Sequence, residues 1–372
     1  MSSTEPVSAT TASQYVPRRI DEYLKEVLSR NGSDLHFIAG DPPRIRMYGE
    51  LIAVKYRELS ANETMALVSE IMPAQVREAF SERTTVDFAY AAEGLARFRV
   101  NVFRHVGGVG AVLRLIPSTI RSIEDLRLPQ TLTNFCQQKK GLVLCTGPTG
   151  SGKSTTLAAL LDYVNAHRKG HIVTIEDPIE YVHTRKQCLI SQREVGFDTP
   201  SFASALHSAL RADPNVILVG EMRDLETISL AVTAAETGVL VFGTVHTNGA
   251  AATVDRIVNA FPPTEQGRIR SMLSTSLVGV ISQQLVRRSD GKGRVAALEV
   301  LVNNSAIANI LRDGKTEQIS TAIQSGSLQG MQSMDTALRR LLDAKQITGM
   351  DAYRKAINKK EFEMYAEAEI AA

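Results

Sequence analysis

A glycine-rich segment near the middle of the chain has the residue types and spacing of a phosphate-binding loop. Residues 147–154 read GPTGSGKS, which fits the pattern G-x-x-x-x-G-K-S/T at every position. Glycines allow successive backbone N–H groups to converge on an anion, and the positive end of the following helix points to the same place. The segment therefore predicts a site for the phosphates of ATP. The residues expected to bind the nucleotide are Gly147, Pro148, Thr149, Gly150, Ser151, Gly152, Lys153, Ser154 and Thr155.

The last residues of this loop have separate expected roles. Lys153 is expected to contact the β- and γ-phosphates, and the hydroxyl of Ser154 is expected to bind Mg²⁺. ATP and Mg²⁺ are therefore the expected cofactors.

Two acidic segments follow apolar runs that read as buried strands. TIEDPIEY occupies 174–181, and GEMRD occupies 220–224. In many nucleotide hydrolases the strand ends in Asp, which helps to hold Mg²⁺, but here Gly220 takes that place and Glu221 follows. These acids predict a metal or water site, although a single one of them could also be a solvated carboxylate or a helix cap. His246 ends a further strand and could contact a γ-phosphate, yet a lone histidine there is more often structural.

An alternation of strands and helices begins near residue 131 and predicts a parallel sheet covered by helices. Because the carboxyl ends of parallel strands meet at one edge of a sheet, the phosphate loop and the acids are expected at the same edge. After residue 303 the chain is expected to be mostly helical. The expected strands are 142–146, 172–176, 216–221, 239–245 and 295–302, and the expected helices include 153–167, 201–212, 224–237 and 265–288.

The first third of the chain has a different sequence pattern. Residues 1–17 are rich in Ser, Thr and Ala and predict a disordered tail. A helix at 18–30 and a later hairpin, with strands near 97–103 and 111–117, predict a small mixed α/β domain over 18–117. Residues 118–130 are expected to be a linker to the second domain.

Four arginines, Arg97, Arg99, Arg104 and Arg114, belong to this hairpin. Arg99 and Arg114 flank its turn almost symmetrically, so they are expected to face each other. Like charges that face each other across strands are destabilising and require a compensating anion. Nearby acidic side chains could balance them on the surface. Alternatively they are arginine fingers that stabilise transition-state charge on a γ-phosphate, with Arg99 and Arg114 first and Arg104 third.

The composition argues against several classes of partner and location. The net charge is +2, aromatic residues make up 5% and Trp is absent, which argues weakly against nucleic acid as a partner. The three cysteines form no CxxC pair that would predict a disulfide framework or a zinc site. The chain shows neither a secretory signal nor a stretch apolar enough to span a bilayer, so a cytoplasmic protein without direct membrane insertion is expected.

Four blocks, in this order along the chain, resemble the type II/IV secretion ATPase superfamily. GPTGSGKS matches its phosphate loop, TIEDPIEY (174–181) its Asp box, ILVGEMRD (217–224) its Gly-Glu Walker B and GTVHTN (243–248) its His box. GSDLHF (32–37) resembles the start of the N-terminal PAS-like domain of this superfamily. The resemblance implies an α/β fold with a RecA-like P-loop ATPase domain and a helical extension over 131–372, preceded by a smaller PAS-like α+β domain.

The resemblance also implies roles for particular residues. Glu180 is expected to be the general base that orients the attacking water, Glu221 to support Mg²⁺ through water, and His246 to sense the γ-phosphate. The arginine fingers would come from the PAS-like domain, which is expected to rotate with the nucleotide state.

Within the superfamily the chain is most similar to the retraction motors of type IV pili. SAIANILRDGK (305–315) resembles their signature, the tetracysteine zinc motif of assembly motors is absent, and the chain begins at the PAS-like block. This implies a homohexameric motor at the inner-membrane pilus base that uses ATP hydrolysis to depolymerise the pilus and drive twitching motility. Its expected partners are an inner-membrane platform protein and a second retraction ATPase. An accessory retraction ATPase, another type II/IV secretion ATPase and, less favoured, a nucleic-acid translocase are the alternatives.

Overall fold

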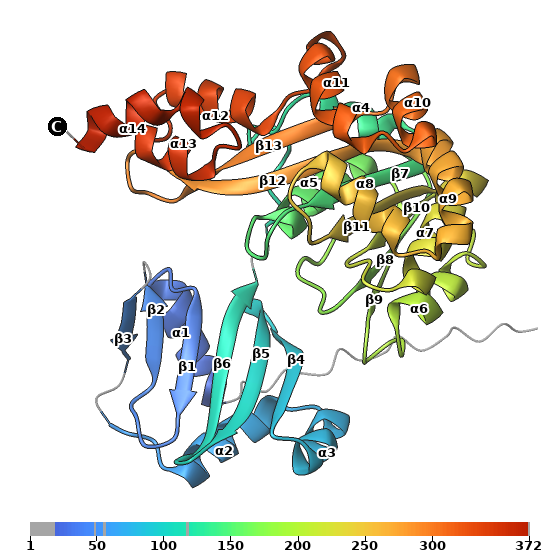
Figure 1. The fold of residues 1–372 in the computed structure, drawn as a ribbon. Coiled ribbons are helices and arrows are strands. Elements are labelled where there is room, and N and C mark those ends of the chain that lie inside the picture. Colours follow the sequence, from blue (N-terminus) through green and yellow to red (C-terminus); the bar gives the residue numbers. More distant parts are fainter. Residues whose placement is uncertain (1–18, 48–49, 55–56, 117–118, 371–372) are drawn as a thin grey trace, which may run out of the picture. The chain divides into compact units, whose positions relative to one another are not determined.

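The computed structural model describes residues 19–47, 50–54, 57–116 and 119–370, so the predicted tail at 1–17 lies outside the described residues. The chain divides into two compact units, residues 1–118 and 119–372 (Figure 1). Among the described residues, no helix is both long and apolar enough to cross a membrane.

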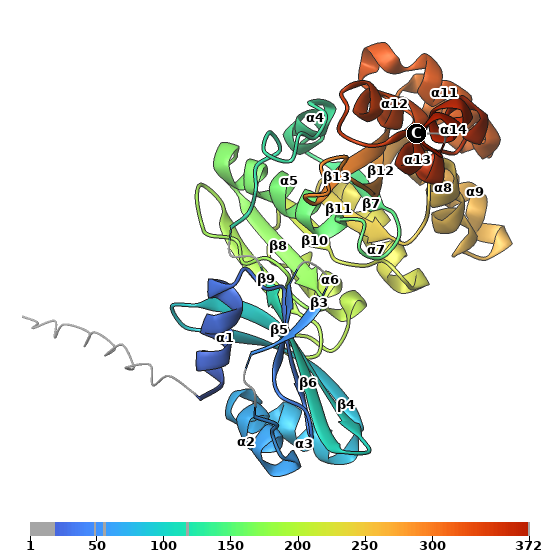
Figure 2. The same ribbon diagram turned by 90° about the vertical axis from the view of Figure 1, so that its left-hand side faces the viewer.

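The first unit is an antiparallel sheet with three helices packed against it. Its strands follow the order β3-β2-β1-β6-β5-β4, and α2 and α3 lie together at one end of the sheet in both views (Figure 1, Figure 2). Helix α2 begins with a capping box formed by Ser60 and Glu63. The elements are α1 (Arg19–Ser29), β1 (Asp34–Ile38), β2 (Arg44–Met47), β3 (Glu50–Ala53), α2 (Ala61–Ile71), α3 (Ala74–Glu82), β4 (Thr85–Ala92), β5 (Ala96–His105) and β6 (Gly108–Ile116).

Strand β5 shows how this sheet separates its two faces. Phe98, Val100 and Val102 are fully buried in the core of the unit, whereas Arg99 between them is exposed. Because successive side chains of a strand point to opposite faces, Arg97 and Arg99 lie on the face away from this core, whereas Arg104 lies on the side of the buried residues and contacts Phe80.

The second unit is a seven-stranded sheet in the order β13-β12-β7-β11-β10-β8-β9. All neighbouring strands are parallel except β12 and β13, which form an antiparallel pair. The elements up to the last strand are α4 (Thr131–Gln137), β7 (Gly141–Thr146), α5 (Lys153–His167), β8 (His171–Glu176), β9 (Leu189–Glu194), α6 (Phe202–Ala209), β10 (Val216–Val219), α7 (Leu225–Thr237), β11 (Leu240–Val245), α8 (Ala250–Asn259), α9 (Pro263–Ser276), β12 (Leu277–Arg287) and β13 (Arg294–Val302).

The central strands are buried on both faces, as expected when helices cover a parallel sheet. On β7, Leu142 and Leu144 belong to one hydrophobic cluster, and Val143 and Cys145 belong to the cluster on the other face. The segment predicted as a linker adds to the second of these clusters through Ile123 and Leu128.

The chain after β13 is helical, as the sequence predicts. Helix α12 packs on the β12–β13 hairpin, where Val286 shares a separate hydrophobic cluster with Met334, Leu338 and Ile347 (Figure 1). The elements are α10 (Ser305–Asp313), η1 (Thr316–Gln318), α11 (Ile319–Ser325), η2 (Ser327–Gln329), α12 (Met334–Asp343), α13 (Gly349–Lys355), η3 (Lys359–Glu361) and α14 (Glu363–Ile370).

The helix predicted over 265–288 is wrong in its second half. Helix α9 ends at Ser276, and β12 begins at Leu277. The sequence of β12 contains several β-branched residues, Val280 and Ile281 are fully buried, and the strand pairs with β7 on one side and β13 on the other. Those two partners satisfy its backbone groups, so tertiary pairing decides the conformation of a segment whose local pattern is ambiguous.

Candidate active site

Four parallel strands bring the predicted site residues to one edge of the second sheet. Strands β7, β11, β10 and β8 are adjacent in that order, with Thr146 beside Val245 and Val219 beside both Gly243 and Ile175. The phosphate loop, His246, Glu221 and the segment that carries Glu180 follow the carboxyl ends of these four strands. Segments from positions 147 to 246 are therefore brought together at the edge where parallel sheets bind ligands.

The phosphate loop adopts a backbone that glycine alone accommodates readily. The φ angles of Gly147, Gly150 and Gly152 are +139°, +76° and +88°. A Cβ atom added to Gly147 would lie 2.3 Å from the carbonyl oxygen of Gln283 on β12, so the loop is packed tightly against the neighbouring strand.

Lys153 begins helix α5 and is only 8% exposed. Its Nζ donates hydrogen bonds to the carbonyl oxygens of Gly147 at 2.8 Å and Pro148 at 3.1 Å. Burial lowers the pKa of the Lys153 ammonium, while the negative charges of Glu221 and Glu180 act in the opposite direction. The ammonium thus lies inside the loop, in position to exchange carbonyl contacts for phosphate oxygens.

Polar atoms around the loop fit a phosphate and a metal ion. The hydroxyls of Thr146 and Ser151 are buried and have no hydrogen-bond partner within the described part of the chain, and buried groups of this kind normally have one. Ser154 lines a small cavity of about 40 Å³ with Glu176, Tyr181, Gly220 and Thr244.

Glu221 is ionised and partly enclosed at the end of β10. It forms an ion pair with Arg223, and Nε2 of His246 lies 3.4 Å from its carboxylate. Partial burial raises the pKa of Glu221, but the hydrogen bond and charge of Arg223, together with His246 and Lys153, outweigh burial and lower it. The carboxylate is therefore available as a ligand for a metal-bound water.

Gly220 occupies the strand-end position where many nucleotide hydrolases carry an acid. A Cβ atom at this position would lie 3.0 Å from the carbonyl oxygen of Ile175 and 3.2 Å from Cα of Glu176. A side chain there would be in tight contact with the backbone of β8, which would have to shift slightly to accept it. The acid at this strand end is Glu221, one residue later.

Glu176 and Glu180 occupy the acidic segment after β8. Glu176 accepts hydrogen bonds from Oγ1 of Thr174 at 2.7 Å and Nε2 of Gln192 at 3.2 Å, and the backbone N–H of Glu180 also contacts its carboxylate. Burial raises the pKa of Glu176 despite these bonds. The sequence analysis included Glu176 in this acidic segment but gave it no role of its own, although an acid in the last position of a buried strand was the available signal.

A pocket beside the phosphate loop contains residues that sequence reasoning missed. It has a volume of about 470 Å³ and is bordered by the loop side at Gly152 and Thr155. The opposite wall comes from the chain before α4 and from the β12–β13 hairpin. The side chains that line this opposite wall include Arg121, Leu126, Leu285, Arg288 and Arg294. No motif links these segments, so the sequence offered no signal for them.

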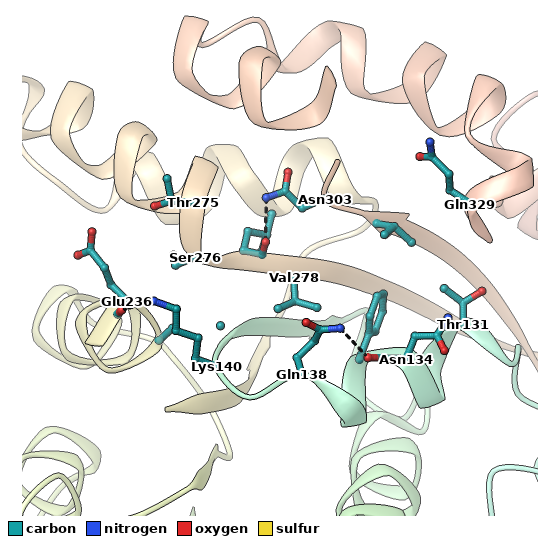
Figure 3. A pocket seen from close by; sticks show the side chains of 15 residues that line it. Thr131, Asn134, Gln138, Lys140, Glu236, Thr275, Ser276, Val278, Asn303 and Gln329 are labelled. Atoms are coloured by element: carbon teal, nitrogen blue, oxygen red, sulfur yellow. Dashed lines mark hydrogen bonds between the residues drawn. The ribbon is translucent and has the colours of Figure 1, made fainter. Parts of the chain in front are cut away.

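A second cavity of about 440 Å³ lies at the opposite edge of the sheet, where β7 and β12 begin (Figure 3). Its polar groups mostly bond to the protein itself. Nε2 of Gln138 donates to the backbone oxygen of Asn134, and Nδ2 of Asn303 donates to that of Leu277 (Figure 3). Nζ of Lys140 donates to the backbone oxygen of Glu236. This cavity is separate from the strand ends that carry the phosphate loop and the acids.

The arginines of the first unit face each other as predicted, with Arg99 and Arg114 paired across β5 and β6. Nε of Arg114 donates to the buried Asp34 at 2.8 Å, and Nε of Arg99 lies 3.8 Å from Asp87. Burial raises the pKa of Asp34, but Ser33 and Arg114 lower it overall. Acidic side chains thus balance both arginines within the unit.

Arg104 has different contacts. Its guanidinium lies 4.8 Å from the centroid of the Phe80 ring and donates to the carbonyl oxygen of Phe80 at 3.3 Å. These contacts hold Arg104 against helix α3.

Among the described residues, no group of three or more His, Cys, Asp or Glu side chains could hold a metal ion. Mg²⁺ commonly binds through one or two side chains, water and the phosphates of its nucleotide. A site built from Ser154 and Glu221 agrees with that chemistry. The three cysteines are buried and unpaired.

Comparison with known proteins finds relatives in one family of secretion and pilus proteins. Residues 9–364 match the family described as type II/IV secretion system protein. The chain is 50% identical to the type IV pilus retractation ATPase PilT of Pseudomonas aeruginosa, over 91% of this chain and 98% of PilT. It is 51% identical to a twitching motility protein of Neisseria gonorrhoeae (86% of each chain) and 41% identical to the type IV pilus ATPase PilU of P. aeruginosa (90% of this chain, 88% of PilU).

A solved structure agrees with this result. The crystal structure of the pilus retraction motor PilT with bound ADP superposes with a TM-score of 0.86 and 45% identity, covering 92% of this chain and 98% of that one. The fold is therefore that of a RecA-like ATPase domain preceded by a smaller N-terminal domain, as the sequence resemblance implied.

Proposed function

The chain belongs to the type II/IV secretion system protein family, and we propose that it is an ATPase motor that retracts type IV pili. Similar chains are named as a pilus retraction ATPase and a twitching motility protein. The observation that carries the proposal is the alignment of four parallel strand ends, which supplies a phosphate loop, two acidic segments and a histidine along one edge.

The nucleotide is proposed to bind along this edge. The phosphates would occupy the loop, with Lys153 turning from its carbonyl contacts to the β- and γ-phosphate oxygens. The nucleoside would enter the adjoining pocket, where Arg121, Leu126 and Arg294 offer both apolar surface and hydrogen-bond donors. The PilT crystal structure contains bound ADP, which supports a nucleotide as the ligand of this fold.

The acids divide the hydrolytic work between two strand ends. Glu180 is assigned as the general base that orients the attacking water, and His246 as the residue that senses the γ-phosphate. Ser154 would hold Mg²⁺ directly and Glu221 would hold it through water. Mg²⁺, when bound, neutralises charge that develops on the phosphate oxygens.

The arginines of the first unit are proposed as arginine fingers. Arg99 and Arg114 are assigned first and Arg104 third. The contacts support that order, because Arg104 is held against Phe80 by stacking and a hydrogen bond, whereas Arg99 has only a 3.8 Å approach to Asp87. Arg114 would have to exchange its bond with Asp34 for one with phosphate.

The assembly and location are proposed from the family. We expect a homohexamer, in which head-to-tail contacts close into a ring. Domain rotation in the ring would act on an inner-membrane platform protein at the base of the pilus and release pilin subunits. A second retraction ATPase is a further proposed partner. The higher identity to PilT than to PilU, 50% against 41%, favours a main rather than an accessory motor.

Steady-state ATPase measurements on the purified protein test the catalytic part of the proposal. Lys153→Ala should abolish turnover, because it removes the ammonium that neutralises phosphate charge. Lys140→Ala is the matched control, since its Nζ contacts the carbonyl oxygen of Glu236 in the cavity at the other edge. Wild-type turnover by Lys153→Ala would refute the assignment of the phosphate loop.

Complementation of a deletion strain tests the cellular part. A strain that lacks this gene should carry excess pili and fail to twitch, and this chain alone should restore twitching. Restoration only when another retraction ATPase is supplied with it would identify an accessory motor instead.

A further inference from the structure

Gln283 connects strand β12 to the phosphate loop through both polar atoms of its side chain. Its Nε2 donates to the carbonyl oxygen of Ser151 at 2.7 Å, and its Oε1 accepts a hydrogen bond from Oγ1 of Thr156 at 2.7 Å. Ser151 lies in the loop, and Thr156 lies in the first turn of helix α5. One amide thus joins the loop to the helix that follows it.

The surroundings of Gln283 leave it little freedom to move. The residue is 2% exposed. Its carbonyl oxygen would lie 2.3 Å from a Cβ on Gly147, and its Nε2 would lie 2.8 Å from a Cβ on Gly152. The preceding residue, Ser282, pairs with Thr146 across the parallel strands β12 and β7. The strand that ends in the phosphate loop and the strand that carries Gln283 are therefore fixed to each other.

We propose that Gln283 is a positioning residue that holds the phosphate loop in the conformation that binds nucleotide. The inference rests on the proposed ATPase function and adds a residue from outside the known motifs. The N–H groups of the loop stabilise a phosphate only when they converge on one point. Their contribution to nucleotide affinity therefore depends on how firmly the loop is held. Without the amide, the carbonyl of Ser151 and the hydroxyl of Thr156 lose their partners, and the loop can relax toward other hydrogen bonds.

The deciding comparison is between two buried glutamines of the same unit. Gln332 also uses both ends of its side chain, donating through Nε2 to the carbonyl oxygen of Leu298 and accepting at Oε1 from Arg340, both at 2.8 Å. Neither of these partners belongs to the phosphate loop. Gln283→Leu and Gln332→Leu therefore remove similar hydrogen bonds, and only the first changes the loop.

The full-length protein would be assayed by titration with a fluorescent ATP analogue and Mg²⁺, by steady-state ATPase kinetics and by thermal unfolding without nucleotide. Both variants should unfold at lower temperature. Gln283→Leu should also weaken nucleotide binding by about tenfold and raise KM in parallel, whereas Gln332→Leu should keep the wild-type affinity within about twofold. A purely structural role for Gln283 would lower the unfolding temperature and leave KM unchanged.

Two further variants keep the test decisive if Gln283→Leu does not fold. Thr156→Val preserves shape and removes one of the two hydrogen bonds, so affinity should fall about threefold to tenfold. Gln283→Glu keeps the acceptor for Thr156 but places a carboxylate against the Ser151 carbonyl, so it should also weaken binding. Wild-type affinity in every folded variant overturns the inference. If the wild-type protein itself binds no ATP analogue, the proposed function fails instead.

Discussion

Gly147→Ala is the substitution whose effect the geometry of the phosphate loop specifies most sharply. Gly147 has a φ of +139°, which a residue with a side chain rarely adopts. The added methyl group would lie 2.3 Å from the carbonyl oxygen of Gln283 and 2.8 Å from Oγ of Ser151. The nearer atom belongs to the backbone of a strand residue that pairs with Leu298 on β13 and directly follows Ser282, which pairs with Thr146 on β7, so it cannot rotate out of the way.

The magnitude follows from two separate costs. An unfavourable backbone conformation costs about 1–3 kcal/mol, and forcing a methyl group into a packed site costs about 1–3 kcal/mol more. The free energy of unfolding should therefore fall by roughly 2–6 kcal/mol, a large part of the 5–15 kcal/mol that is typical of a domain. If the loop shifts to relieve the clash, nucleotide affinity should fall as well.

Gly150→Ala is the matched control in the same loop. Gly150 has a φ of +76°, but nothing lies within 4 Å of an added Cβ, so only the backbone cost of about 1–2 kcal/mol applies. Urea unfolding without nucleotide, followed by circular dichroism, measures both losses. Equal losses in the two variants would refute the claim that β12 packs against the loop at Gly147.

Three further predictions concern the acids and the arginines. Glu180→Gln should retain ATP binding and slow phosphate release by about 10²-fold or more, because the attacking water loses its base. In assembled rings, Arg99→Ala and Arg114→Ala should each slow hydrolysis by about 10³-fold, and Arg114→Ala should also destabilise the first unit because the buried Asp34 loses a donor. Burial raises the pKa of Glu176 above its ordinary value of 4.5, so the unfolded chain releases this proton at a lower pH than the folded chain does. The wild-type protein therefore loses stability as pH rises from 4.5 to the raised pKa. Glu176→Gln has no such proton and should gain stability relative to wild type over the same pH range. Urea midpoints at several pH values measure this difference.

Each of these has an outcome that contradicts it. Near-wild-type hydrolysis by Glu180→Gln would make Glu180 a surface carboxylate. Normal hydrolysis by rings of both arginine variants would leave them with the role of balanced surface charges that their acidic neighbours already suggest. The difference in urea midpoint between Glu176→Gln and wild type should change as pH rises from the ordinary glutamate pKa. A constant difference would show that burial does not raise the pKa of Glu176.

The features that sequence predicted well are local or follow from simple symmetry. The phosphate loop is a contiguous pattern, and its glycines have the positive φ angles that such a loop requires. Arg99 and Arg114 were expected to face each other because they flank the hairpin turn, and the register of β5 and β6 confirms it.

The features that sequence missed depend on which strands become neighbours. Strand β12 was expected to be helical, and its identity as a strand follows from its position between β7 and β13. Gln283 and the side chain of Leu285 reach the phosphate loop and its adjoining pocket only because of that position. No pattern within 277–287 marks a contact with Ser151 or Thr156, which lie far earlier in the chain.

The unusual Gly-Glu pair after β10 shows how such packing shapes the site itself. Gly220 lies close to the backbone of β8, while the backbone N–H of Met222 donates to the carbonyl oxygen of Thr244 and ties the next turn to β11. Glu221 is thereby held between the ends of two strands, where Arg223 and His246 keep it ionised. A Mg²⁺ ion held through water by Glu221, as proposed above, would compete with Arg223 for this carboxylate and would thereby couple metal binding to release of the Arg223 side chain.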